Sequence, residues 1–258
     1  MIGPVETLGD WFIQLAYGTG SLVILWVRMV RRLPRLLRHP GLLIRQMDVI
    51  GIGSLPLVIF ASMFVGAVSA AQAGYQMQDY APLSYVGAAV GKAVILELAP
   101  VLTALVVAGR VSTSIAAELG TMQVTEQVDA LETMAIDPVW YLAAPRYFAG
   151  LLMMPILVVT SSVVAILGGY VVSYISLDLS TATYFNGVRM LFEVWDVVVN
   201  QTKAVIFGGI ITLAGVYFGY RTSGGAEGVG RSTINAIVAA SVLILVFNFI
   251  IATLMVTT

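Results

Sequence analysis

The chain has 258 residues, of which 59% are hydrophobic and only 10% are charged. Soluble domains carry about 25% charged residues, so a fold of this size could not cover its surface with polar side chains in water. This composition excludes an ordinary soluble enzyme, a disordered chain and a nucleic-acid-binding protein. With no cysteine and one histidine, His39, the chain offers no disulfide, no thiolate nucleophile and no multi-histidine metal site. We therefore expect no catalytic and no metal-binding residues.

The first 47 residues predict a helical segment at the membrane interface. Residues 11–27 are apolar but stand at the short limit for a span. Six arginines follow between positions 28 and 45, interleaved with leucines, which is typical of an amphipathic helix in the headgroup plane. Pro34 and Pro40 should divide this stretch into short pieces. The sequence leaves open whether residues 11–27 cross the membrane or lie in the interface.

Five apolar runs follow, and each is a candidate for crossing a bilayer. They cover residues 49–74, 86–109, 147–175, 204–220 and 234–256. We therefore predict an all-α integral membrane protein. It would comprise an N-terminal amphipathic interfacial helix within residues 1–47 and a five-span domain over residues 48–258.

The basic residues predict how this domain is oriented. Ten of the 13 Lys and Arg residues lie in residues 28–45, 110–146 and 221–231. Because Lys and Arg accumulate on the cytoplasmic side of membrane proteins, we place these segments in the cytoplasm. The C-terminus then lies on the opposite side.

The polar loop after the second run predicts a short amphipathic helix over about residues 125–137. Thr125 can cap its start, and Asp137 before Pro138 should end it. Apolar and acidic residues fall on different faces at helical spacing. The apolar residues are Val128, Leu131 and either Met134 or Ala135, and the acidic ones are Glu126, Asp129 and Glu132. Such a helix could dock into another protein, or it could simply connect two spans.

Three sequence blocks in this region carry a family resemblance: AELGTM (117–122), TEQVDAL (125–131) and MAIDP (134–138), followed by Pro145-Arg146. With them the chain resembles the MlaE/YrbE-type permease subunit of ABC lipid transporters that work with MCE proteins. The glycine-rich segment 222–231 is similar to a cytoplasmic loop of the same family. The likeness runs over nearly the whole chain.

The resemblance implies a permease that moves phospholipid between the bacterial inner membrane and a periplasmic MCE protein. It also implies a homodimer, an ABC ATPase that binds ATP and Mg²⁺, a STAS-domain subunit on that ATPase and an MCE hexamer. The chain itself would bind no cofactor and catalyse no reaction. The residues expected to couple it to the ATPase are Glu118, Thr125, Glu126, Asp129, Leu131, Glu132, Met134, Asp137 and Arg146. The direction of transport and the preferred lipid headgroup stay open.

Two features concern the membrane interior. Small residues at the exit of the first run either leave room for an acyl chain or pack helices together. With the resemblance, we expect lipid contacts at Met63, Gly66, Ala70, Tyr75, Met77, Tyr80 and Glu97.

Glu97 is the second of these features, because it lies inside the second apolar run. An ionised carboxylate at such a position costs roughly 2.5–3.5 kcal/mol, so it needs a partner. We predict an ion pair with Lys203 from the fourth run, since Lys92 lies off the face of Glu97. The alternative function is an ion- or proton-driven carrier in which Glu97 is the coupling group.

Overall fold

The computed structural model describes residues 4–78 and 82–256, and within them it contains helices and no strand. Five helical stretches are long and apolar enough to cross a membrane: Pro40–Met77, Leu83–Val124, Val139–Ser176, Val194–Tyr220 and Gly225–Met255. The predicted fold class and the five spans are thus confirmed. The helices extend beyond the apolar runs because a helix continues into the interface wherever its next residues can still form helical hydrogen bonds.

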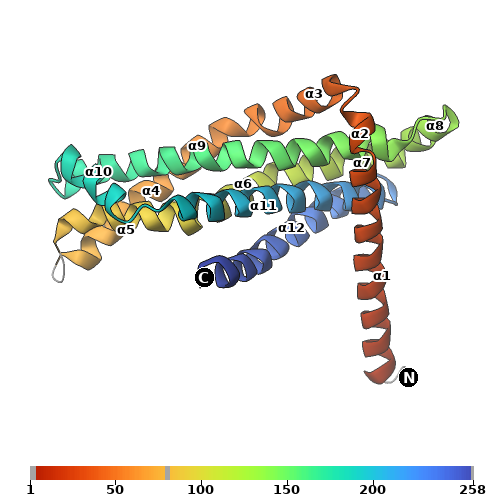
Figure 1. Ribbon diagram of the computed structural model, residues 1–258. Coiled ribbons are helices and arrows are strands. Elements are labelled where there is room, and N and C mark those ends of the chain that lie inside the picture. The colour runs from red at the N-terminus through yellow and green to blue at the C-terminus, as the bar shows by residue number, and fades with distance from the viewer. Residues whose placement is uncertain (1–3, 79–81, 257–258) are drawn as a thin grey trace.

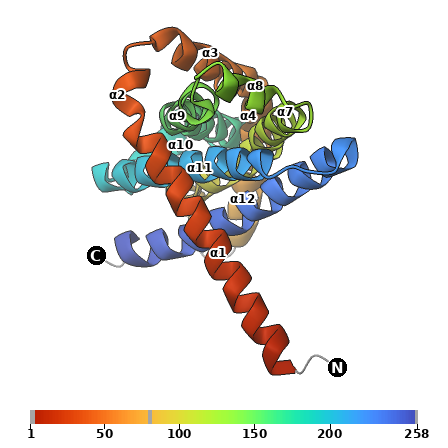
Figure 2. The same ribbon diagram turned by 90° about the vertical axis from the view of Figure 1, so that its right-hand side faces the viewer.

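The N-terminal segment forms a helix that runs across one end of the bundle. α1 (Pro4–Arg31) crosses the long helices instead of following them (Figures 1 and 2). The short α2 (Leu33–Leu36) and α3 (Pro40–Ile50) follow, each with a proline in its first turn. Residues 11–27 therefore belong to one helix that runs across the others and is not among the five described stretches long and apolar enough to cross a membrane.

The first and third spans form the closest helix pair. α3 leads through a short turn, η1 (Ile52–Ser54), into α4 (Leu55–Met77), which packs along α9 (Ala144–Ser176). A Cβ built on Gly66 would lie 1.7 Å from the carbonyl oxygen of Ala165. Beside this contact, the Ser62 hydroxyl donates to the Ser161 hydroxyl over 2.8 Å. Small residues thus allow the two backbones to touch, as they do in many membrane helix pairs.

The second span is a helix with two irregular turns. After η2 (Leu83–Tyr85) it runs through α5 (Val86–Ala93), α6 (Ala99–Val107) and α7 (Thr113–Val124). Two π-helical turns, η3 (Val94–Leu98) and η4 (Ala108–Ser112), join these pieces. Pro100 has no N–H to donate to the carbonyl of Leu96. Carbonyl groups of η3 are therefore available to neighbouring helices.

The remaining helices complete the bundle. α10 (Thr181–Met190) closes one end, which we call the α10 end, and α8 (Gln127–Thr133) marks the other, the α8 end (Figure 1). The buried Tyr184 of α10 donates its hydroxyl to the Ile166 carbonyl over 3.0 Å, and burial raises the pKa of this phenol. α11 (Val194–Tyr220) packs against α7, α9 and α12 (Gly225–Val256).

Two glycine pairs spaced four residues apart serve packing within the subunit. Gly87 of α5 approaches the Tyr184 carbonyl of α10, and Gly215 of α11 approaches Ile115 of α7. The glycine-rich segment 222–231 forms a tight turn only at Gly224 and Gly225, which have φ values of 88° and 71°. From Gly225 onward the segment is the first part of α12, which corrects the expectation of a longer loop.

We predict that Gly66→Ala destabilises the protein although alanine favours helices over glycine. The added methyl would collide with the Ala165 backbone, and such overpacking typically costs about 1–3 kcal/mol. Gly20→Ala is the matched control, because nothing lies within 4 Å of its Cβ position and α1 should gain stability there. Thermal unfolding in detergent measures both. Equal melting temperatures for the two variants would contradict the close α4–α9 contact.

Candidate functional site

The segment between the second and third spans is mostly helical. α7 continues to Val124, and α8 begins only two residues after Thr125. The Thr125 hydroxyl donates back to the Thr121 carbonyl over 2.8 Å, while Glu126 stands at the N-cap position with φ 58°. The prediction that Thr125 caps the short helix is therefore wrong. The helix of the second span continues through α7 to Val124, so Thr125 is the C-cap residue of α7 and not the N-cap residue of α8.

α8 also ends earlier than expected. Ala135 adopts φ 60°, and the N–H of Ile136 donates to the Leu131 carbonyl over 2.9 Å. This pattern is a Schellman motif, in which a left-handed residue terminates a helix. The helix thus ends at Thr133, and Asp137 before the proline is not its stop signal. The Asp137 carboxylate instead belongs to the start of the third span.

The two faces of α8 have different surroundings. Val128 is buried in the core, and Leu131 is half-buried against it. Met134 and the three acidic side chains are exposed to solvent; these acids are Glu126, Asp129 and Glu132. No ion pair among the described residues involves these three carboxylates. α8 therefore presents an acidic surface with one exposed methionine.

Two contacts attach the base of α8 to the rest of the molecule. Asp137 Oδ2 lies 2.8 Å from a guanidinium nitrogen of Arg32, at the junction of α1 and α2. The Tyr220 hydroxyl, at the end of α11, donates to the Pro138 carbonyl over 3.0 Å. The base of α8 is thus bonded both to the helix that crosses the bundle and to a span.

A buried arginine links two spans at the same end. Arg146 of α9 lies 2.7 Å from the Glu118 carboxylate of α7 and donates to the Leu142 carbonyl over 2.8 Å. A buried guanidinium requires such partners because burying an unpaired charge is costly. The structure therefore brings together two of the residues that the sequence assigned to coupling. Arg146 faces Glu118 and not solvent.

Glu97 lies in η3 and faces α11 and α12. One of its carboxylate oxygens is 2.7 Å from the Lys203 ammonium, and the other accepts from the Asn248 amide over 3.0 Å. The Lys203 side chain is fully buried, whereas that of Glu97 is 43% exposed. Lys203 also donates over 2.9 Å to the Leu96 carbonyl, for which Pro100 supplies no helical donor. Lys203 thus forms the ion pair expected from the sequence and also satisfies a carbonyl of the second span that has no helical donor.

Sequence reasoning missed two amides of this region. Asn200 donates over 2.6 Å to the Ile95 carbonyl of η3, and Asn248 holds the outer oxygen of Glu97. A signal was present, because Asp196, Asn200 and Lys203 stand at positions i, i+4 and i+7. This spacing places one polar stripe on an otherwise apolar helix.

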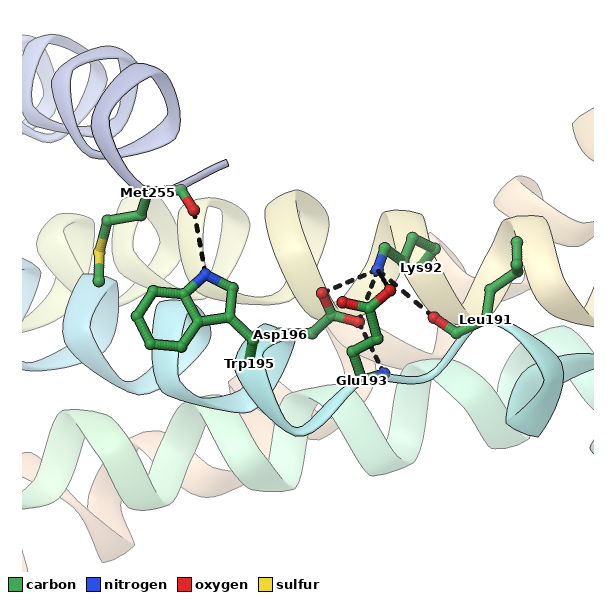
Figure 3. A network of polar contacts seen from close by, with 6 residues as sticks. All are labelled: Lys92, Leu191, Glu193, Trp195, Asp196 and Met255. Carbon is green, nitrogen blue, oxygen red and sulfur yellow. Dashed lines mark hydrogen bonds and ion pairs between the residues drawn. The ribbon is translucent and has the colours of Figure 1, made fainter. Parts of the chain in front are cut away.

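A second polar cluster lies where α11 begins (Figure 3), which is toward the α10 end of the bundle (Figure 1). Both carboxylate oxygens of Asp196 are 2.9 Å from the Lys92 ammonium, and a Glu193 oxygen is 3.8 Å from it. Asp196 also accepts the Glu193 N–H over 3.1 Å, which completes a capping box at the start of α11. Lys92 therefore pairs with α11 and not with Glu97. Within residues 4–78 and 82–256, no three His, Cys, Asp or Glu side chains are grouped to hold a metal.

The residues predicted to contact lipid do not share one surface. Of those besides Glu97, Gly66 and Ala70 are buried and Met77 is half-buried. Met63 and Tyr75 are exposed. Tyr80 lies outside the described residues. Gly66 serves the α4–α9 contact, so this small residue packs helices together, and the lipid contacts of this stretch stay a prediction.

An apolar cavity of about 450 Å³ lies elsewhere, between α1, α9, α11 and α12. Trp26 and Tyr147 line it, and the Trp26 indole donates to the Tyr147 hydroxyl over 2.6 Å. Leu151, Ile206 and Phe247 contribute apolar walls. The sequence did not indicate this cavity, because its walls come from four helices that are distant in the chain.

Comparison with known proteins bears on these features. The family model described as "Permease MlaE" matches residues 43–254. A "probable ABC transporter permease protein" of Rickettsia bellii is 39% identical over 254 residues, which is 98% of each chain. The "intermembrane phospholipid transport system permease protein MlaE" of Haemophilus influenzae is 31% identical over 99% of this chain and 98% of its own. The chloroplastic protein TRIGALACTOSYLDIACYLGLYCEROL 1 of Arabidopsis thaliana is 34% identical over 81% of this chain and 60% of its own.

We predict that Glu97→Ala destabilises the protein more than Glu97→Gln does, because both remove the counter-charge of Lys203 but only glutamine keeps hydrogen bonds to Lys203 and Asn248. Alanine would leave the buried Lys203 ammonium without its carboxylate partner, a loss of at least about 1–3 kcal/mol. Glutamine keeps an oxygen for Lys203, and its amide can donate to the Asn248 oxygen, which has no hydrogen-bond partner. Thermal unfolding of the two variants tests this difference. A glutamine variant as unstable as the alanine variant would contradict it.

Proposed function

Because the chain belongs to the MlaE permease family, we propose that it moves phospholipid between the bacterial inner membrane and a periplasmic MCE protein. The name of the Haemophilus influenzae relative, which refers to intermembrane phospholipid transport, supports this substrate. A separate ABC ATPase binds ATP and Mg²⁺ and supplies the energy. The permease contributes binding and movement and breaks no covalent bond.

The single observation that carries the coupling role is the way α8 is held. Its acidic face is exposed, its apolar face packs on the core, and its base is bonded to Arg32 and Tyr220. A helix attached in this manner moves with the spans when a partner pushes it. We assign ATPase contacts to the exposed Glu126, Asp129, Glu132 and Met134, with Thr125 beside them. Glu118, Leu131, Asp137 and Arg146 would then hold the coupling helix in place.

We place the α8 end in the cytoplasm, since ten basic residues lie in the three segments that the sequence assigns to this end. The α10 end and the C-terminus then lie in the periplasm, near the MCE hexamer. Residues 1–47 form the interfacial segment, and residues 48–258 form the permease domain. The STAS-domain subunit binds the ATPase, so the spans of this chain do not need to contact it.

A second copy of the chain completes the permease in this proposal. α12 leaves most of its apolar surface uncovered within one copy, including Val238, Val242, Leu245 and Phe249. A homodimer formed along α12 would cover part of that surface and enclose a space between the copies. Met63 and Tyr75 on the exposed side of α4, the Trp26–Tyr147 cavity and the Glu97 cluster are the places where we expect lipid.

The alternative, a proton-driven carrier with Glu97 as the coupling group, receives less support. The carboxylate is bonded to Lys203 and Asn248 from two other helices, which suits a fixed link between spans. A coupling group has to exchange its partners during each cycle. The acidic face of α8 would also have no role in a carrier that needs no ATPase.

We predict that the double substitution Asp129→Lys and Glu132→Lys releases the ATPase. Reversing two charges on the exposed face should weaken the association at least tenfold, since like charges across an interface repel. Co-purification of the ATPase from membranes measures the effect. Asp48→Lys, which changes an exposed acid of α3, is the control and should retain the ATPase. Full retention and unchanged lipid transport in the double variant would refute the coupling role of α8.

A further inference from the structure

An open cavity of about 560 Å³ lies between α5, the start of α11 and the end of α12. Lys92, Glu193 and Asp196 form its polar wall, and Trp195 and Met255 stand beside them (Figure 3). The Trp195 indole donates to the Met255 carbonyl over 3.1 Å, which fixes the indole between α11 and α12. The cavity is therefore a defined space with charged and aromatic walls.

The depth of this cavity corresponds to the lipid headgroups. The far end of α11 is bonded to α1, the proposed interfacial helix, because Arg221 donates to the Ser21 hydroxyl over 2.8 Å. Asp196 stands 25 residues before Arg221, which is roughly 37 Å along a helix. The hydrocarbon core of a bilayer is only about 30 Å thick, so Asp196 reaches the opposite headgroup layer. Trp195 next to it is a residue type enriched at that level.

The charges in the cavity are not balanced. The Lys92 ammonium is bonded to both oxygens of Asp196, whose side chain is only 5% exposed. Glu193 is 69% exposed and lies 3.8 Å from the same ammonium. One cation therefore faces two carboxylates, and the cavity carries a net charge of about −1. Such a cavity disfavours a purely anionic headgroup and has room for a second cation at Glu193.

A zwitterionic headgroup meets these requirements. The Lys92 side chain is 32% exposed, and its ammonium donates to both Asp196 oxygens and, over a longer 3.4 Å, to the Leu191 carbonyl (Figure 3). A phosphate at the open side would replace this last and longest bond. Two carbons beyond a lipid phosphate, an ammonium can reach the Glu193 carboxylate, which lies 3.8 Å from the Lys92 ammonium, and the half-exposed Trp195 lines the same cavity. Cations bind over tryptophan faces by electrostatic attraction. We propose that this cavity binds amine-bearing zwitterionic phospholipid, with its phosphate at Lys92 and its ammonium between Glu193 and Trp195.

The cavity lies between the same helices as the contacts of Glu97 with Lys203 and Asn248. This inference rests on the proposed lipid transport and adds a headgroup site to it. Asp196 and Lys203 are seven residues apart on α11, and Asn248 and Met255 are seven apart on α12. Each spacing corresponds to roughly 10 Å along a helix. A lysine–carboxylate pair thus occurs at two levels between the same helices. The cavity is the level that a headgroup would occupy at the surface of the bilayer.

The test uses the full chain in nanodiscs with equal amounts of phosphatidylethanolamine and phosphatidylglycerol. After extraction into detergent, mass spectrometry gives the ratio of the two lipids that the protein retains. We expect the wild type to enrich phosphatidylethanolamine about threefold. Glu193→Gln should bring the ratio close to one, because it removes the carboxylate but keeps an acceptor for the capping box. Trp195→Leu should also lower the ratio.

Asp178→Asn is the matched control, since it removes an exposed carboxylate near the same end without touching the cavity, and asparagine tolerates its φ of 51°. This variant should keep the wild-type ratio. Lys92→Gln should lower the retention of both lipids together, because both carry the phosphate. Retained phospholipid without any headgroup preference, or a preference that Glu193→Gln leaves unchanged, would overturn the headgroup assignment alone. A wild-type protein that retains no phospholipid would also contradict the proposed function.

Discussion

Inside a bilayer no water is available, so every exposed carbonyl and every charge must find its partner within the protein. In this chain the constraint acts most strongly on the second span. Pro100 and the π turn η3 leave carbonyl groups without helical donors, and Asn200 and Lys203 of α11 supply them. Lys203 then requires Glu97 as its counter-charge. Because Glu97 is also bonded to Asn248, one break in a helix leads to a chain of bonds across three helices.

The same principle explains how the two ends of the bundle differ. At the α8 end, Arg146 and Arg32 are paired with carboxylates of neighbouring segments, which leaves the acids of α8 exposed. Near the α10 end, Lys92 is shared by two carboxylates, of which one remains accessible. The proposed docking surface and the proposed headgroup site would thus both use carboxylates that remain exposed, those of α8 and that of Glu193. α11 connects both ends and is bonded to polar groups at each.

Much of the fold could be predicted from the sequence, because a bilayer of fixed thickness requires apolar runs of a fixed length. The Glu97–Lys203 pair could also be foreseen, since a carboxylate inside a span needs a cation and few were available. The bounds of α8 could not. They depend on Glu126 and Ala135, two residues other than glycine that adopt left-handed conformations. Local propensity disfavours this backbone, and only the surrounding contacts select it.

The packing role of Gly66 and the positions of the cavities could not be predicted from the sequence either. A run of small residues is compatible with a lipid trough and with tight packing, and only the position of α9 shows that Gly66 packs against Ala165. The cavity at Glu193 requires three helices to be placed relative to one another. Its residues are separated by about 160 positions in the chain, from Lys92 to Met255.

The most direct measurement reconstitutes this protein with its ATPase in vesicles and follows a fluorescent phospholipid on its way to an acceptor MCE protein. The account requires that transfer stops without ATP, stops with vanadate, and does not respond to an imposed proton gradient. Transfer that proceeds without ATP and follows the proton gradient would contradict it and would favour a carrier.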